Sequence, residues 1–142
     1  EKTKSEFRDD GFFITGDMGY LDQDNYLTIV GRNKDLIITG GLNVYPKEIE
    51  TMIDTDGNVE ESAVIGVSHP DFGEGIVAII VEKKGHKLDH HTLQAALKKN
   101  LATFKLPKKI HIIEELPRNT MGKVQKNVLR DLYKDEFRKT NK

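Results

Sequence analysis

Two long stretches of β-branched residues dominate the hydrophobic pattern of the chain. Residues 61–67 and 75–81 are rich in Val and Ile, and shorter apolar runs cover residues 36–39 and 110–113. Short apolar runs that are bounded by Gly, Pro and polar residues are typical of buried strands. The pattern therefore predicts strands at these four positions.

Three further segments carry apolar residues at the spacing of an amphipathic helix. One begins near Pro46, which suits the first turn of a helix, and the others cover residues 88–102 and 124–137. The last segment places Val128 and Leu132 at helical spacing. Strands and helices that follow one another in this order predict a compact α+β domain.

The first part of the chain has a different pattern. Two β-prone runs, residues 19–21 and 26–30, flank a polar turn and predict a hairpin. The polar stretch 31–35 then interrupts the apolar pattern and indicates a linker. We therefore expect two parts, a hairpin segment at residues 1–33 and the α+β domain at residues 34–142.

Composition narrows the class of protein but does not name a function. The chain has 142 residues, 37% of them hydrophobic and 32% charged, which is typical of a globular protein. It has no cysteine, which excludes disulfides and thiolate metal sites and fits a reducing compartment, so we expect a cytoplasmic protein. No apolar run approaches the ~20 residues of a transmembrane helix.

The charge is balanced overall and uneven along the chain. A net charge of −1 gives no reason to expect binding to nucleic acid. From Lys98 onward, however, the chain contains 13 basic and 5 acidic residues, whereas the residues before it include 9 basic and 18 acidic ones. This basic segment is either a solvated lysine-rich surface or a surface for phosphate-bearing ligands.

Several kinds of site are excluded by spacing. The five histidines show no pair with the spacing of a helical zinc site, and we expect no metal site. The chain has no Gly-x-Ser-x-Gly motif of a serine hydrolase. Gly122-Lys123 is not part of a phosphate-binding P-loop, because Val124 stands where Ser or Thr is required.

Three positions have both a structural and a chemical interpretation. Asp17 either caps a turn or accepts hydrogen bonds from vicinal hydroxyls, such as those of a ribose. Gly40-Gly41 forms either a plain turn or a backbone surface that a ligand approaches closely. Lys123 is the last residue of an eight-residue loop-like stretch, and it is either an exposed lysine or a cation that stabilises a developing anion.

Together these segments resemble one family, the acyl-adenylate-forming enzymes, which include acyl-CoA synthetases, peptide-synthetase adenylation domains and luciferases. The matching stretches are GFFITGD (residues 11–17), GRNKDLIITGGLNVYPKEIE (31–50) and PRNTMGK (117–123). The motifs are most similar to those of malonyl-CoA synthetases and fatty-acid–CoA ligases. The resemblance implies a small C-terminal lid domain with a central mixed sheet of about three strands flanked by helices.

The resemblance also implies a role for each candidate residue. Asp17 would bind the ribose hydroxyls of ATP and of the acyl-adenylate, and Arg32 would assist at the same nucleotide. Lys34 would be the hinge about which the lid rotates. The loop Gly40-Gly41-Leu42 would line the channel for the pantetheine arm of CoA. Lys123 would contact the carboxylate and α-phosphate oxygens during adenylation.

The implied reaction has two steps. Carboxylate and Mg-bound ATP would give acyl-AMP and pyrophosphate, and the thiol of CoA would then displace AMP. The family's phosphate loop, adenine contacts and acyl pocket lie in a large N-terminal domain, whose last hairpin is residues 1–33. We therefore expect this chain to be inactive alone, to hold no tightly bound cofactor, and to work with that domain.

Three alternatives remain open at this point. The acid would be malonate, which local similarity favours, or a fatty acid, since the pocket that selects it would lie in the N-terminal domain. The acyl acceptor would be CoA or a carrier protein. A third possibility, of another class, is a stand-alone binding or regulatory module.

Overall fold

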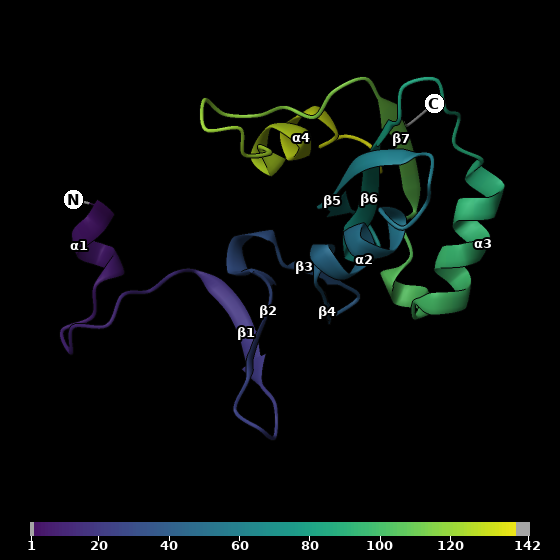
Figure 1. The fold of residues 1–142 in the computed structure, drawn as a ribbon. Helices are drawn as coiled ribbons and strands as arrows, with labels where there is room; N and C mark the ends of the chain where they lie inside the picture. The colour runs from purple at the N-terminus through teal and green to yellow at the C-terminus, as the bar shows by residue number, and fades with distance from the viewer. Residues whose placement is uncertain (1, 139–142) are drawn as a thin grey trace. The chain divides into compact units, whose positions relative to one another are not determined.

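The computed structural model describes residues 2–138 of the chain, and side chains from Lys4 to Arg138. The chain forms two compact units, one up to Lys34 and one from Asp35 onward. Figure 1 labels the elements of both units.

The first unit is built around an antiparallel hairpin. A short helix, α1 (Lys2–Glu6), precedes strands β1 (Asp17–Leu21) and β2 (Leu27–Arg32). Asp22 forms the predicted turn by accepting hydrogen bonds from two backbone N–H groups of the residues that follow it. Between residues 4 and 34 no residue is buried, so this unit has no core of its own.

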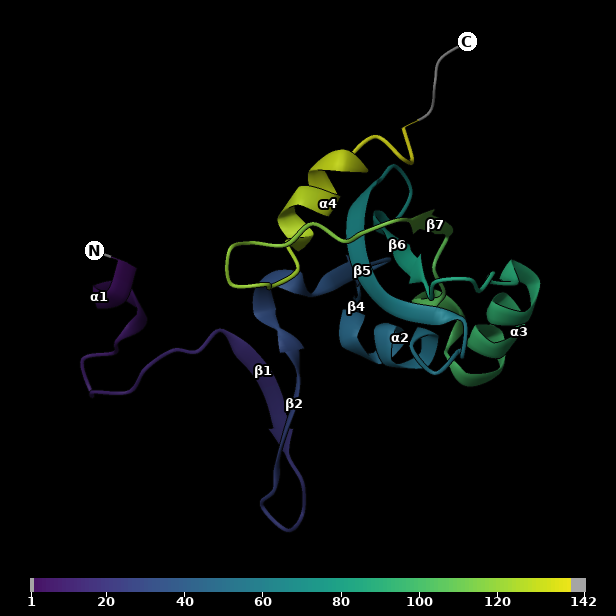
Figure 2. The ribbon, with the colours of Figure 1, turned by 45° about the horizontal axis from the view of Figure 1, so that its top comes forward.

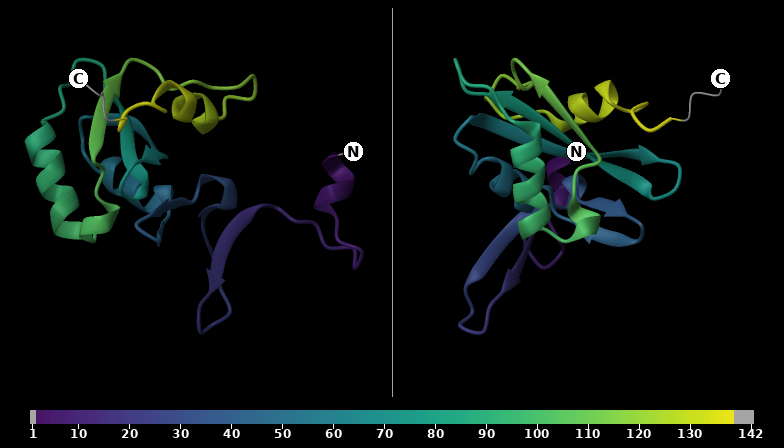
Figure 3. Two further views of the ribbon diagram at one scale, coloured as in Figure 1. Left: turned by 180° about the vertical axis from the view of Figure 1, so that it is seen from behind. Right: turned by 90° about the vertical axis from the view of Figure 1, so that its right-hand side faces the viewer.

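The second unit contains a five-stranded mixed sheet. Its longest strands, β5 (Val59–His69) and β6 (Gly73–Glu82), form an antiparallel pair. Strand β7 (Lys109–Ile113) runs parallel to β6, and Figure 3 shows the two side by side from behind. Strand β3 (Ile37–Thr39) joins β6 at one residue pair, and β4 (Leu42–Val44) forms the edge beyond it.

Helices cover both faces of this sheet. Helices α2 (Pro46–Ile53) and α3 (His90–Asn100) pack on one face, and α4 (Lys126–Leu132) packs on the other (Figures 1 and 2). The Val and Ile side chains of β5 and β6 alternate between two apolar cores, one on each face. Burial on both faces explains why these strands are continuous hydrophobic runs in the sequence.

The structure confirms the α+β class and corrects two details. The sheet has five strands rather than about three, because β4 and the short β3 extend it. Helix α4 ends at Leu132, well before residue 137, and Leu132 is 70% exposed. The buried contact of this helix is made instead by Leu129, one turn earlier on the inner face.

None of the described helices is both long and apolar enough to cross a bilayer.

Candidate functional site

Asp17 and Arg32 face each other at the end of the hairpin where β1 begins and β2 ends. The Arg32 Nε lies 2.7 Å from the Asp17 Oδ1, and the Arg32 Nη1 donates to the Thr15 carbonyl oxygen at 3.0 Å. Both side chains remain accessible, with 28% of the Asp17 side chain and 50% of the Arg32 side chain exposed. The structure thus brings together the two residues predicted to bind a nucleotide.

Lys34 lies between two anchored neighbours. It is the exposed central residue of a short 3-10 helix, η1 (Asn33–Asp35). On one side, the Asn33 N–H donates to the Gly16 carbonyl oxygen at 2.9 Å within the first unit. On the other, Asp35 forms an ion pair with Arg130 of α4 at 3.2 Å. Each anchor holds its neighbour in a different unit, so Lys34 is well placed to absorb a change in backbone angle.

Gly40 and Gly41 form the two-residue turn between β3 and β4. Thr39 pairs with Leu42 across this turn, and φ is +56° at Gly40 and +78° at Gly41. Positive φ at both central positions is the mark of a type I′ turn, which favours glycine. The Gly40 N–H donates to the Phe72 carbonyl oxygen at 2.8 Å, which ties the turn to the start of β6.

Lys123 lies on a tight loop between β7 and α4, which we call the Lys123 loop (residues 117–125). The Gln125 N–H donates to the Pro117 carbonyl oxygen at 2.7 Å and closes the base of the loop. The Lys123 side chain is exposed. Within the part of the chain that the structure describes, its ammonium group has no hydrogen-bond or ion-pair partner.

The tip of the Lys123 loop is fixed by its own side chains. The Asn119 Oδ1 accepts hydrogen bonds from the backbone N–H groups of Met121 at 3.0 Å and Lys123 at 2.9 Å. Gly122 turns the chain with φ of +78°. The Arg118 Nη1 donates to the Gly122 carbonyl oxygen at 2.8 Å. A free cation is therefore presented from a backbone that is held in place.

Two ion pairs connect the ends of this loop to strand β5 and to helix α2. Arg118 pairs with Glu61 of β5. Lys126, the first residue of α4, contacts the Glu50 Oε1 of α2 at 2.5 Å. The same Glu50 oxygen accepts the Val64 N–H at 2.9 Å. Among the side chains that the structure describes, Glu50 is one of two buried polar or charged residues. No sequence pattern indicates these partners, because the paired residues lie far apart in the chain.

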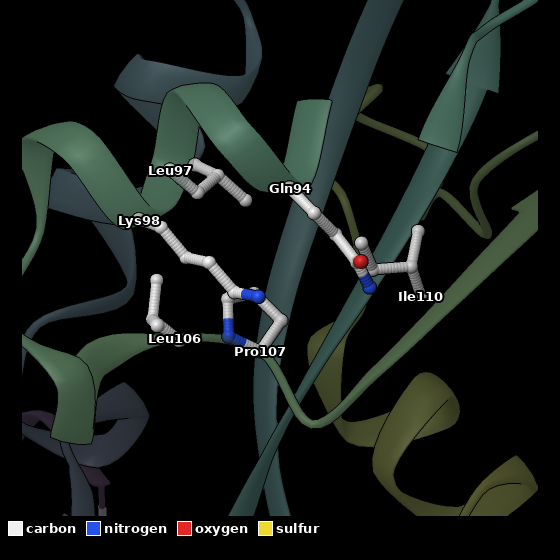
Figure 4. Close-up of a pocket in the computed structure, with 6 residues that line it drawn as sticks. All are labelled: Gln94, Leu97, Lys98, Leu106, Pro107 and Ile110. Atoms are coloured by element: carbon white, nitrogen blue, oxygen red, sulfur yellow. The ribbon is translucent and has the colours of Figure 1, made fainter. Parts of the chain in front are cut away.

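One hollow of the second unit is too small for a ligand pocket. A hollow of about 90 Å³ lies between α3 and the segment before β7 (Figure 4). It is lined by Gln94, Leu97, Lys98, Leu106, Pro107 and Ile110. This volume is well below the roughly 300 Å³ of small ligand pockets. No group of three or more His, Asp or Glu side chains within residues 2–138 could hold a metal ion.

Comparison with known proteins identifies the family. The family model of the AMP-binding enzyme C-terminal domain matches residues 48–123. The 2-succinylbenzoate–CoA ligase of Listeria innocua is 44% identical over 133 residues, which cover 94% of this chain and 28% of that protein.

Solved structures have the same fold. The crystal structure of ATP-bound MatB from Rhodopseudomonas palustris matches with a TM-score of 0.87 at 61% identity, over 97% of this chain and 27% of that one. The Mycobacterium tuberculosis fatty acyl CoA synthetase matches with a TM-score of 0.74 at 42% identity, over 96% of this chain and 27% of that one.

The chain therefore spans about a quarter of the length of the proteins it matches. Its resemblance to adenylate-forming CoA ligases is confirmed at the level of the family. The chain belongs to the AMP-binding enzyme C-terminal domain family.

Proposed function

We propose that this chain is the lid of an ATP-dependent acyl-CoA synthetase, which converts a carboxylate, ATP and CoA into acyl-CoA, AMP and pyrophosphate through an acyl-adenylate. The proposal is carried by the Lys123 ammonium group, which has no partner among the described residues. Hydrogen bonds from Arg118 and to Asn119 hold the backbone of its loop. Attack of a carboxylate on the α-phosphate brings two anions together, so a fixed cation helps most in the transition state. The named CoA ligases among the relatives support the same reaction.

The exposed apolar side chains of the first unit favour the proposal of a large partner domain. Its hairpin and the segment before it expose Phe12, Tyr26, Leu27 and other large apolar side chains. An isolated two-stranded hairpin is marginally stable in water and needs a further surface to cover its apolar side chains. We infer that the large adenylation domain, to which we assign residues 1–33, provides this cover. A stand-alone module would leave these side chains in water.

Asp17 and Arg32 are proposed to hold the nucleotide. A ribose offers two hydroxyl donors, and a carboxylate accepts both, while the Arg32 guanidinium fixes the carboxylate and faces nearby phosphate oxygens. No part of this assignment requires the ion pair to break, because the Asp17 carboxylate remains partly exposed.

Replacing Asp17 by Ala in the intact ligase is expected to raise the KM for ATP roughly tenfold to a hundredfold, since hydrogen bonds to a charged group contribute about 1.5–3 kcal/mol. Steady-state kinetics at saturating carboxylate measure this change. The matched control is Asp24→Ala, in the turn of the same hairpin. A lower melting temperature with an unchanged KM would show that Asp17 only caps its turn.

Lys34 is proposed as the hinge about which the lid rotates between the two half-reactions. Rotation is needed because a lysine that serves adenylation must withdraw before the thiol enters. Replacing Lys34 by Pro fixes φ and is expected to slow at least one half-reaction on the order of 100-fold, because a misplaced group costs that much. Pre-steady-state assays of each half-reaction measure this effect. Lys34→Ala, which keeps the backbone free, should retain both. Two normal half-reactions in the proline variant would exclude Lys34 as the hinge.

The proposal also covers the substrates of the ligase and its cellular compartment. We propose malonate as the acid and a fatty acid as the alternative, on the motif resemblance and on the higher identity to MatB than to the fatty acyl CoA synthetase. The proposed ATP is Mg-bound, and the proposed acceptor is CoA rather than a carrier protein. A cytoplasmic enzyme fits a chain that contains no cysteine.

The direct test is an assay of the intact ligase. Carboxylate-dependent exchange between ATP and pyrophosphate is expected with malonate and should be screened against a panel of fatty acids. The second half-reaction is then measured with free CoA and, separately, with a phosphopantetheinyl carrier protein. A ligase that shows no exchange with any carboxylate contradicts the proposed function. Transfer to the carrier alone favours the second acceptor.

A further inference from the structure

Strand β3 pairs along its length with β4 but has little backbone pairing with β6. It shares one residue pair with β6, between Thr39 and Gly73. Continuing that antiparallel register would place Ile38 opposite Glu74. At this position the acceptor is a side chain, because the Ile38 N–H donates to the Glu74 Oε2 at 2.7 Å. The carboxylate of Glu74 therefore takes the place of the next ladder bond.

The neighbouring strand leaves room for this carboxylate. Glu74 pairs with Ser68 of β5, so Gly66 is its diagonal neighbour on the same face of the ladder. A Cβ at Gly66 would lie 2.8 Å from the Glu74 Oε1 and 2.9 Å from the Ile37 Cγ2. The absence of a side chain at Gly66 thus lets Glu74 and β3 approach β5 together.

The hydrogen bond that the Glu74 carboxylate accepts from Ile38 lies next to the glycine turn. Ile38 is two residues before Gly40, whose own N–H donates to the Phe72 carbonyl oxygen. The two bonds hold the strand on either side of Thr39. A bond between a carboxylate and a backbone N–H is stronger than a neutral one. Without it, the strand that leads into the turn would be tied to β6 only at Thr39 and Gly40.

We propose that Glu74 is a positioning residue for the turn at Gly40-Gly41-Leu42 and acts in thioester formation without touching the substrate. The proposal rests on the proposed function, in which this turn lines the channel for CoA. It assigns Glu74 to the second half-reaction and predicts no role in adenylation, which depends on the Lys123 loop.

The experiment compares three variants of the intact ligase. Glu74→Ala removes the acceptor, and Glu74→Gln keeps an acceptor oxygen without the charge. Glu82→Ala is the matched control. Glu82 lies at the other end of β6 and also accepts a backbone N–H, that of Leu88 at 2.6 Å. The rate of acyl-AMP formation, the rate of thioester formation from supplied acyl-AMP, and hydrogen exchange of residues 37–42 are measured for each.

The expected result is a split between the half-reactions. Glu74→Ala should slow thioester formation about tenfold, as the loss of a charge-assisted hydrogen bond predicts, and leave adenylation within about twofold. Exchange of the Ile38 amide should accelerate by a similar factor. Glu74→Gln should recover most of both effects, and Glu82→Ala should change neither readout.

Two outcomes overturn the proposal. One is equal slowing of both half-reactions by Glu74→Ala, which would indicate general destabilisation. The other is an unchanged exchange rate at residues 37–42, which would show that Glu74 does not hold the turn. A wild-type enzyme without thioester formation would contradict the proposed function instead, and the exchange measurement would still decide whether Glu74 positions the turn.

Discussion

Replacing Lys123 by Ala in the intact ligase is expected to slow acyl-AMP formation roughly 10²–10³-fold, the effect of removing one preorganised donor from a developing anion. The Lys123 ammonium has no partner among the described residues, so its charge is available to a substrate. Formation of the thioester from supplied acyl-AMP should remain within about twofold. Rapid-quench assays of the two half-reactions measure the two rates separately.

Two further variants control this experiment. Lys123→Arg retains a cation in a different shape and should recover part of the adenylation rate. Lys87→Ala removes an exposed lysine from the turn before α3 and should leave both half-reactions unchanged. Equal loss of both half-reactions in Lys123→Ala would contradict a role confined to adenylation. A normal adenylation rate would remove Lys123 from the mechanism altogether.

Replacing Lys126 by Ala is expected to lower the free energy of unfolding by about 3 kcal/mol, because it leaves a buried carboxylate without its cation. Only 10% of the Glu50 side chain and 18% of the Lys126 side chain are exposed. Among the described residues, the Val64 N–H remains as the single hydrogen-bond partner of the Glu50 side chain in the variant. Urea unfolding of the intact protein, followed by a probe in the second unit, measures the change.

An exposed ion pair of the same region provides the control. Lys134→Ala breaks the contact of Lys134 with Asp131, whose side chains are 63% and 79% exposed. Such pairs contribute about 0–1 kcal/mol. The double variant Glu50→Gln with Lys126→Met should recover much of the stability, since neither residue is then charged. If Lys126→Ala unfolds at the same urea concentration as Lys134→Ala, the buried pair does not stabilise the domain.

The second unit was largely predictable because its strands are buried on both faces. Val and Ile then occupy consecutive positions, and β5 and β6 stand out in the sequence as apolar runs. Strand β4 does not stand out, because it has three residues and includes the polar Asn43. The sequence pattern also overextends α4, since apolar side chains continue past Leu132 without forming a helical face.

The residues of the candidate site could be predicted from sequence motifs, but their contacts could be predicted only in part. Counting back from the Asp22 turn along an unbroken ladder would place Asp17 opposite Gly31. A shift in register between Met18 and Gly19 places it opposite Arg32 instead, and no sequence pattern predicts that shift. The Glu50–Lys126 contact joins residues 76 positions apart, so it depends on the tertiary fold alone.

Strand β6 separates the two apolar cores of the second unit, and the Glu50–Lys126 ion pair joins the helices on either side. Ile79 belongs to the core under α4 and the Lys123 loop, whereas its neighbour Ile80 belongs to the core under α2 and α3. Substitutions at sites without shared partners usually add in free energy. Substitutions of buried residues under α3 should therefore change the free energy of unfolding while the Lys123 loop keeps its own contacts.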